Sequence, residues 1–399
     1  MLWNLEFMES GIETGPYPRA SECSNETPSE PRFMTKQSRH PVRALLINAV
    51  LIVLAFSLLG AAIWNNRAQL REVIARGLDA RIVALAFAIY MTSFLLTFVR
   101  WWRLVRVIEP GFTLHDAALL GFIGNLFNLV IPGAIGGDLI KAGFLARMRV
   151  NRAQAIASMV IDRILGLLGL FLLAGIAGAA AWPLATPDVR KLIVIVWIAI
   201  AAGFLGLVAI FNQALTRRHP ELLKGHGRLA KILVELSAMS TSYRKRIGVL
   251  VLALGLSVLV HVLNVVAFYT ISRTIFPSGL PSLGQHFLLV PLTLFTTAVP
   301  LPFGALGLSE QVSAQLFQLV HHPGGALAMM GFRVLMYGGG LVCAGVYLAR
   351  IRQVRALTAE AEHIEDDMLE EQQSDLQEDS PPVDSEADQP EGEPYDDRA

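Results

Sequence analysis

Long hydrophobic runs alternate with short polar or basic stretches along most of the chain. A run of about 18 or more apolar residues with few charges is long enough to cross a bilayer as a helix. Such runs occupy residues 44–63, 82–99, 164–182, 192–211, 247–271 and 326–349. The pattern therefore predicts an all-α, polytopic integral membrane protein with six spanning helices.

Two further segments, residues 117–137 and 287–320, are apolar enough to enter the membrane but are interrupted by proline and glycine. The first contains NLVIPGAIGGDLIKA, in which Pro132 lacks a backbone N–H and the glycines permit unusual backbone angles. Non-helical chain inside a bilayer must be buried in protein or line a hydrated cavity, because unpaired backbone groups are costly there. We therefore expect two broken, re-entrant helical segments beside a cavity. Two full crossings, giving eight membrane helices, are the alternative.

The basic residues distinguish these topologies, because cytoplasmic loops of membrane proteins carry an excess of Lys and Arg. If both broken segments return to the side that they entered, eighteen bases lie in the cytoplasm and seven on the opposite side. If both cross, the loops with four and eight bases move outside and only three bases move in. Re-entry is the better fit, and it places both termini in the cytoplasm.

The chain also divides into two similar halves, at about residues 41–186 and 187–355. Each half has three spans with a broken segment before the third. Because three is an odd number of crossings, the second half starts on the opposite side of the membrane, and the halves would be inverted relative to each other. LVIPGAIGGD in the first half and AVPLPFGALGLSE in the second both end in a carboxylate, Asp138 or Glu310. An arginine follows each carboxylate, Arg163 after 25 residues and Arg333 after 23. Chance similarity is the alternative to an inverted repeat, which is a recurring construction in transporters.

The composition agrees with a membrane protein, since the 399 residues are 53% hydrophobic and have a mean hydropathy of +0.50. The formal net charge of zero combines an acidic tail, with 17 acids and one base after Ala356, and a basic remainder. We expect residues 1–40 to be disordered, 41–355 to form the membrane domain and 356–399 to form a disordered acidic tail. Met1 and Met34 both remain candidate start codons.

The charged residues near the broken segments are candidates for function. The start of a helix attracts anions, and neighbouring cations such as Lys141 and Arg163 strengthen the attraction, so a lipid phosphate would suit the start near Asp138. Charges inside a membrane are costly, which favours a functional role for Asp162, Arg163, Glu310 and Arg333. Structural alternatives exist for each: a helix cap for Asp138, an i,i+3 pair with Lys141, snorkelling for Asp162 and Arg163, and a helix-locking pair for Glu310 and Arg333.

Other polar residues have simpler interpretations. The sequence RWWR, residues 100–103, has the composition of an interfacial belt after a span, although Arg100 or Arg103 could also supply charge to the site. His261 and Asn264 lie one turn apart and are expected to bond to a neighbouring helix. Residues 221–246 are expected to form an amphipathic helix on the cytoplasmic leaflet, with a plain linker helix as the alternative.

Four stretches resemble a known family: RWWRLV at residues 100–105, GNLFNLVIPGAIGGDLIKAGFL at 124–145, the pair Asp162 and Arg163, and PLPFGALGLSE at 300–310. Over residues 42–352 the chain resembles the lysylphosphatidylglycerol synthase transmembrane-region family of flippase-like membrane proteins. The soluble synthase domain of the multidomain relatives is not evident, so the resemblance implies transport without synthase activity. Lys141 stands where an arginine is commoner, which keeps the charge but loses bidentate geometry.

The substrate-binding or translocation residues expected from the sequence and the resemblance are Asn128, Pro132, Gly136, Gly137, Asp138, Lys141, Asp162, Arg163, Pro302, Gly304, Gly307, Glu310 and Arg333. Their expected task is to move a polar or charged phospholipid, glycophospholipid or lipid-linked sugar between leaflets of the bacterial cytoplasmic membrane. A membrane-embedded lipid-headgroup transferase and a scaffold acting through the acidic tail are the alternatives.

The sequence has no Walker loop, nucleophile elbow, histidine-rich phosphatase pattern or metal-ligand cluster. We therefore expect no enzyme activity, cofactor, metal or nucleic-acid partner. The expected partners are membrane lipids, including an anionic phospholipid substrate.

Overall fold

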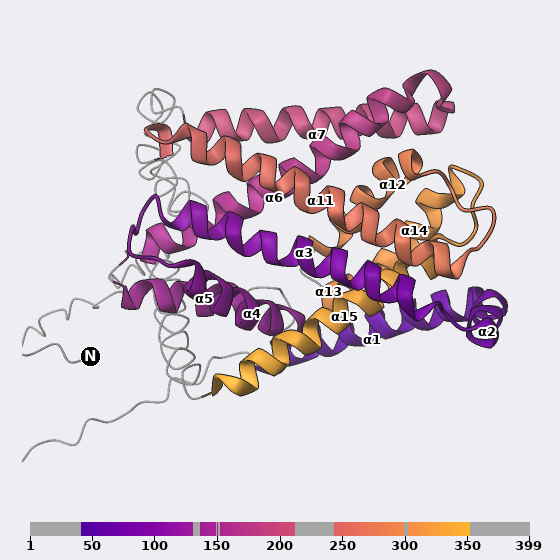
Figure 1. The fold of residues 1–399 in the computed structure, drawn as a ribbon, viewed down its shortest axis with the longest axis horizontal. Helices are drawn as coiled ribbons and strands as arrows, with labels where there is room; N and C mark the ends of the chain where they lie inside the picture. The colour runs from indigo at the N-terminus through magenta and orange to yellow at the C-terminus, as the bar shows by residue number, and fades with distance from the viewer. Residues whose placement is uncertain are drawn as a thin grey trace, which may run out of the picture. The chain divides into compact units, whose positions relative to one another are not determined.

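The structure is a computed structural model of the chain. It describes residues 41–130, 136–148, 150, 152–211, 243–298 and 302–351. All regular structure in these residues is helical (Figure 1). The expected disordered ends, residues 1–40 and 356–399, lie outside the described residues, as does all but the last part of the expected amphipathic helix.

The helices follow the predicted order in both halves. The first half contains α1 (Pro41–Asn65), α2 (Arg67–Arg76), α3 (Ala80–Val105), α4 (Leu114–Val130), α5 (Gly136–Arg147), α6 (Arg152–Ala181) and the short η1 (Trp182–Leu184). The second half contains α7 (Pro187–Phe211), α11 (Ile247–Ile275), α12 (Leu283–Phe295), η2 (Thr296–Ala298), α13 (Pro302–Ala305), α14 (Leu308–Gln318) and α15 (Gly325–Ala349).

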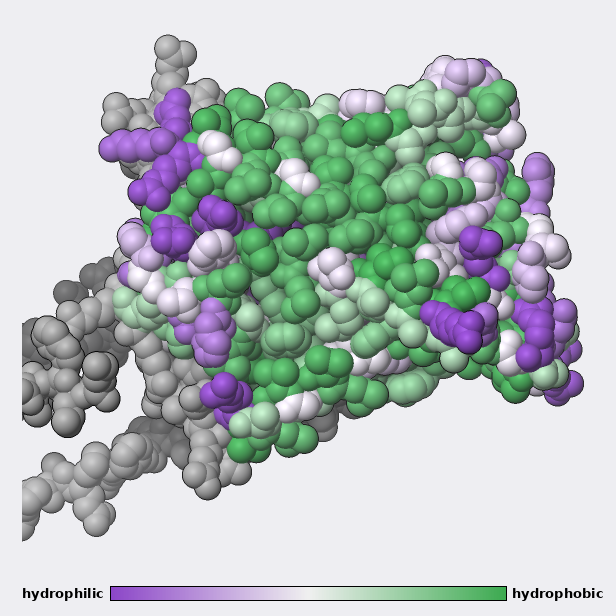
Figure 2. All heavy atoms as spheres, viewed as in Figure 1, coloured by the Kyte–Doolittle hydropathy of each residue, from purple (hydrophilic) through white to green (hydrophobic). Residues whose placement is uncertain are grey.

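Five described helices, α3, α6, α7, α11 and α15, are long and apolar enough to cross a membrane. A sixth span is formed if α1 and α2 are counted together, although the chain bends by 72° between them. The five helices match five of the predicted spans, and the first predicted span, residues 44–63, corresponds to the apolar α1 part of the bent pair. Figure 2 shows hydrophobic side chains over the middle of the visible face and hydrophilic side chains gathered at its two ends, as a membrane protein requires.

One boundary differs clearly from the hydrophobic pattern. The third run begins at residue 164, whereas α6 begins at Arg152. The apolar run begins only after Asp162 and Arg163, two charged residues within α6. Both side chains have charged partners within the protein, so the helix can include them.

The first broken segment is an antiparallel hairpin of α4 and α5. The rings of Phe112, just before α4, and Phe144, late in α5, lie 6.4 Å apart. At the other end of the pair, the backbone N–H of Gly137 donates to Asn128 Oδ1 at 3.0 Å. The helices approach closely here, since a Cβ atom on Gly137 would overlap the carbonyl oxygen of Gly124. The chain therefore turns back after α4, as expected for a re-entrant segment.

The second broken segment forms an equivalent hairpin from α12 and α14. The rings of His286 and Phe317 lie 5.3 Å apart, and the hydroxyl of Thr296 donates to Ser309 Oγ at 2.9 Å. Residue numbers thus rise along α12 while they fall along the facing part of α14. The short helix α13, close to the turn, contacts α4 of the first hairpin.

The central pair of helices, α3 and α11, is antiparallel. Ser93 Oγ donates to Asn264 Oδ1 at 2.6 Å, and Arg100 Nη1 donates to Ser257 Oγ at 2.9 Å. The base of the first hairpin lies at the end of α3, where the rings of Trp101 and Phe112 are 5.1 Å apart. The base of the second hairpin lies toward the end of α11, whose Tyr269 is 5.0 Å from the ring of His286. The two hairpins therefore enter from opposite ends.

Equivalent helices make equivalent contacts in the two halves. Helix α4 packs on α15, with the rings of Phe127 and Tyr347 5.9 Å apart, and α12 packs on α6, with Phe171 and Phe295 5.0 Å apart. The first hairpin thus packs against α15 of the second half, and the second hairpin packs against α6 of the first half. This exchange of contacts is the pattern expected of an inverted repeat.

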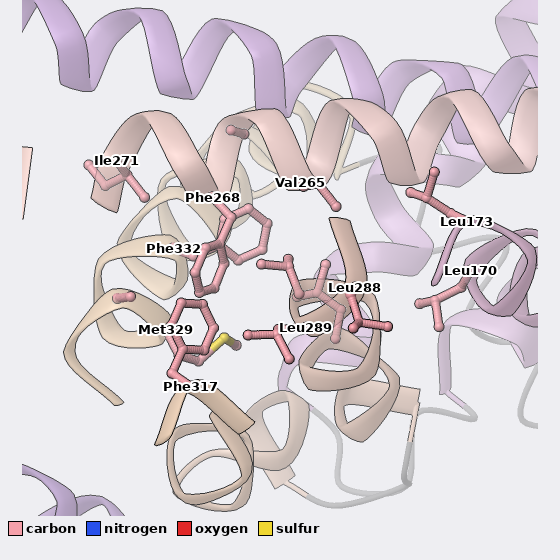
Figure 3. Packing of buried hydrophobic residues seen from close by; sticks show 14 of the residues in the cluster. Leu170, Leu173, Val265, Phe268, Ile271, Leu288, Leu289, Phe317, Met329 and Phe332 are labelled. Carbon is pink, nitrogen blue, oxygen red and sulfur yellow. The ribbon is translucent and has the colours of Figure 1, made fainter. Parts of the chain in front are cut away.

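The largest buried hydrophobic cluster fixes the second hairpin against its own half. In Figure 3, Phe268 of α11, Phe317 of α14 and Met329 and Phe332 of α15 gather around one centre with Leu289 of α12. The rings of Phe268 and Phe332 are 5.5 Å apart. Dense packing of this kind holds α12 and α14 in one position relative to α11 and α15.

Candidate functional site

A cavity of about 500 Å³ lies where the two halves meet. Its walls come from α3, α4, α6, α11, the end of α12 with η2, and α15. Its polar lining consists of Tyr90, Ser93, Thr97, Arg100, Asn125, Arg163, His261, Asn264 and Thr297. Ser93 and Asn264 lie near the middle of their long helices, so the cavity sits deep within the predicted membrane region. A hydrated pocket beside broken segments is what the interrupted sequence pattern predicts.

Arg100 is the most buried charge of this cavity. Its guanidinium binds both carboxylate oxygens of Asp162, at 2.8 and 2.9 Å, and also donates to Ser257. The residue is 7% exposed and Trp101 is 4% exposed. The interfacial-belt interpretation of RWWR is therefore wrong for its first two residues, whereas Arg103 is exposed and stacks on the ring of Trp102.

Asp138, in the first turn of α5, carries a second ion pair. Arg163 of α6 donates to Asp138 Oδ2 from Nη2 at 2.5 Å and from Nε at 2.9 Å. Lys141 Nζ lies 3.6 Å from Asp138 Oδ1, which is the i,i+3 pair considered from the sequence. The Arg163 side chain is 47% exposed and lines the cavity, so this ion pair is accessible from it.

A small polar recess of about 90 Å³ borders the same residues. Asn128, Lys141 and Asp162 line it, and it shares Thr97 and Asn125 with the large cavity. The ammonium group of Lys141 lies 5.0 Å from the centre of the Trp101 ring, which adds a cation–π contact. Helices α3, α5 and α6 thus place three cations, Arg100, Lys141 and Arg163, and two carboxylates, Asp138 and Asp162, around neighbouring polar spaces.

The equivalent ion pair in the second half, Glu310 with Arg333, has different surroundings. Its side chains are 0% and 4% exposed, and Arg333 Nε donates to Glu310 Oε1 at 2.5 Å. Glu310 Oε2 also accepts the backbone N–H of Gly307 at 2.7 Å. Neither charged side chain lines the cavity, which α15 reaches through Phe332 and Met336.

Arg333 also holds the irregular backbone before α14. Its Nη1 donates to the carbonyl oxygens of Phe303 and Gly304, at 3.0 and 3.3 Å. Phe303 and Gly304 have φ values of 56° and 66°, and Gly307 has 83°, in the left-handed region that favours glycine. A Cβ on Gly307 would overlap Leu58 of α1. This geometry is that of a pair that locks two elements together, the structural alternative considered for Glu310 and Arg333.

The structure thus brings Asn128, Gly137, Asp138, Lys141, Asp162 and Arg163 together beside the cavity. Gly304, Gly307, Glu310 and Arg333 lie in a separate cluster around the buried Glu310–Arg333 ion pair. Pro132 lies outside the described residues, and only the backbone of Gly136 and Pro302 is described, at the starts of α5 and α13.

Sequence reasoning missed several lining residues, among them Ser93, Thr97 and Asn125. Ser93, Thr97 and Arg100 recur at helical spacing on one face of an apolar span, which is a signal that could have identified that wall. His261 and Asn264 bond to neighbouring helices as expected, His261 Nε2 lying 3.0 Å from the carbonyl oxygen of Gly166, but they also line the cavity.

The described residues contain no group of three or more His, Cys, Asp or Glu side chains that could hold a metal ion. The polar lining offers hydrogen-bond donors and two guanidinium groups, which suit a phosphate or a sugar hydroxyl.

Comparison with known proteins agrees with this architecture. Residues 42–345 match the family described as the lysylphosphatidylglycerol synthase TM region, over nearly the same range as the sequence resemblance. No curated protein matches the chain. The match covers well over half of the 399 residues. The chain is therefore a multi-pass membrane protein of lipid metabolism or transport, and it belongs to the lysylphosphatidylglycerol synthase transmembrane-region family.

Proposed function

We propose that the protein moves a polar or charged lipid, such as an anionic phospholipid, a glycophospholipid or a lipid-linked sugar, between the leaflets of a bacterial cytoplasmic membrane. The observation that carries this proposal is the polar cavity of about 500 Å³ where two oppositely oriented halves meet. The headgroup would enter the cavity while the acyl chains stay in the bilayer. Two inverted halves can expose such a site to each side in turn by rocking against one another.

The charges of the cavity support a phosphate-bearing headgroup. Arg100 and Arg163 each bind an aspartate, and Lys141 also lies beside Asp138, so the charges of the site are paired rather than isolated. Arg163 is the more accessible of the two guanidinium groups. An anionic headgroup can therefore compete with Asp138 for Arg163 at a smaller desolvation penalty than it would face at Arg100.

A transferase would need a carboxylate that is free to accept a proton. Asp138, Asp162 and Glu310 each bind an arginine, which favours roles in recognition and structure over general-base catalysis. The proposal is therefore movement of an unaltered lipid.

Leaflet transfer in proteoliposomes tests this function. Vesicles that hold the full-length protein and phosphatidylglycerol with a quenchable headgroup label should expose inner-leaflet label to an external quencher faster than empty vesicles. Asp138→Asn should slow the transfer by roughly tenfold or more, because without the competing carboxylate Arg163 and Lys141 would hold an anionic headgroup instead of releasing it.

Asp188→Asn is the matched control, since Asp188 forms an exposed i,i+3 pair with Lys191 at 3.1 Å, away from the cavity. It should transfer lipid at the wild-type rate. Transfer no faster than in empty vesicles would contradict the proposal, and a change in lipid mass on incubation would favour the transferase.

A further inference from the structure

A separate space lies between α7 and α11, away from the cavity. It is an apolar groove of about 550 Å³ with Leu165 and Leu168 of α6 as its floor. Phe204 and Val208 of α7 and Val251 of α11 are exposed along its sides. It shares no lining residue with the polar cavity. The groove therefore forms a separate site on the outer surface of two spanning helices.

The mouth of this groove is basic. Arg244 lines it, and Lys245 and Arg246 follow directly, all three with exposed side chains. The turn that carries them is anchored by Tyr243, which is fully buried and donates its hydroxyl to the carbonyl oxygen of Leu104 at 3.1 Å. The backbone N–H of Arg246 in turn donates to the carbonyl of Tyr243 at 2.9 Å. The contacts of Tyr243 thus fix the position of the basic cluster, Arg244, Lys245 and Arg246, at the mouth of the groove.

The depth of the groove suits an acyl chain. From Ile247 to Leu254, both of which line it, α11 advances roughly 10 Å at 1.5 Å per residue. The groove therefore runs from the end of a spanning helix, where headgroups lie, into the hydrocarbon region. Arg244 lies at the end of the groove next to the start of α11, the position that a snorkelling base takes at a membrane interface.

We propose that this groove binds one anionic phospholipid of the leaflet at the start of α11, with its phosphate on Arg244 and an acyl chain against Leu165, Leu168 and Val251. Charge complementarity selects the headgroup, because clustered bases next to a membrane helix attract anionic lipids. The exposed apolar walls select a chain rather than a soluble anion. The site is distinct from the cavity, so it does not depend on the proposed transport.

Lipid retention measures this site without any transport step. The full-length protein is placed in nanodiscs of phosphatidylcholine and phosphatidylglycerol, and the lipids that stay bound after release are counted by native mass spectrometry. We expect wild-type protein to retain phosphatidylglycerol in preference to phosphatidylcholine. Arg244→Gln should lower phosphatidylglycerol retention by about fivefold, which is the effect of one base near an anionic lipid. Val251→Trp, which fills the groove, should lower retention of both lipids.

Two matched controls should retain lipid as the wild type does. Arg350→Gln removes an exposed base at the end of α15, which lies at the same end of the molecule as the start of α11 but outside the groove. Leu205→Trp places the same indole ring at an exposed α7 position that does not line the groove. Equal retention in Arg244→Gln and Arg350→Gln, or in Val251→Trp and wild type, would overturn the proposal.

A photoactivatable probe identifies the occupant directly. It is attached to Val251→Cys after Cys23 and Cys343 are replaced by Ser and Ala. An adduct with phosphatidylglycerol supports the site. A cross-link to residues 212–242 of the chain instead of lipid shows that the protein's own segment fills the groove, which also overturns the proposal.

Discussion

Two ion pairs stand at equivalent places in the two halves but have opposite surroundings. Asp138 and Arg163 lie beside a polar cavity, whereas Glu310 and Arg333 are almost completely buried. An accessible pair contributes little to stability and can exchange partners with a ligand. A buried pair cannot lose one member without leaving an uncompensated charge. The same residue types thus form an accessible pair in one half and a rigid, buried pair in the other, which agrees with the recognition role that we propose for the first.

Glu310→Gln should therefore destabilise the protein strongly. The substitution leaves Arg333 buried without its carboxylate and also weakens the acceptor of the Gly307 N–H, and breaking such a pair costs about 3–5 kcal/mol. Thermal unfolding of the detergent-solubilised protein measures the loss. Asp138→Asn is the control and should change stability by about 1 kcal/mol or less. Equal losses in the two variants would contradict the division of roles.

Arg163 should show a graded response to substitution. Arg163→Gln removes the charge that faces the cavity and should abolish most leaflet transfer. Arg163→Lys keeps the charge but loses the planar guanidinium, so we expect intermediate transfer. The proteoliposome assay measures both, and identical rates for Gln and Lys would show that charge at this position has no part in transfer.

The first hairpin depends on a close approach between α4 and α5. Gly137→Ala should disrupt it, because the new Cβ would overlap the backbone carbonyl of Gly124 and no side-chain rotation can relieve that overlap. We expect lower thermal stability and slower transfer. Gly206→Ala on α7 is the control, since a Cβ there meets nothing within 4 Å. The control should be neutral or slightly stabilising, because alanine has the higher helix propensity.

Helices and hairpins differ in how well the sequence predicts them. The spans follow from hydrophobic runs, and the breaks follow from Pro and Gly in an apolar setting. The hydrophobic pattern does not predict helix α2, because the helix is polar. Its Arg76 nevertheless donates to the last carbonyl oxygens of α11, including that of Ile275 at 2.7 Å. The interfacial interpretation of Arg100 fails because the burial of a charge depends on a partner, Asp162, 62 residues away, whereas the alternative that Arg100 supplies charge to the site agrees with its place in the cavity lining. Contacts over such distances have no local signal.

At the scale of the whole molecule, the first hairpin meets the second half through α15. Asn125 Nδ2 of α4 lies 3.5 Å from the buried thiol of Cys343. Asn125→Cys should therefore allow an oxidant to join the first hairpin to α15. If the halves rock during transfer, the oxidised protein should transfer lipid more slowly than the same protein after reduction.

The double variant Asn125→Cys with Cys343→Ala separates the cross-link from the loss of the asparagine. Its transfer rate should not respond to oxidant or reductant. An oxidised single variant that transfers lipid as fast as its reduced form would show that α4 and α15 need not separate.

The unequal burial of the two ion pairs has a consequence for energetics. Perfectly matched inverted halves would make the two outward and inward geometries equal in free energy, with equal populations. The Glu310–Arg333 lock fixes one hairpin, while the Asp138–Arg163 pair leaves the other open to competition from a ligand. If the protein moves lipid as proposed, this asymmetry should favour one resting orientation, and a bound lipid should shift the balance through the Asp138–Arg163 pair.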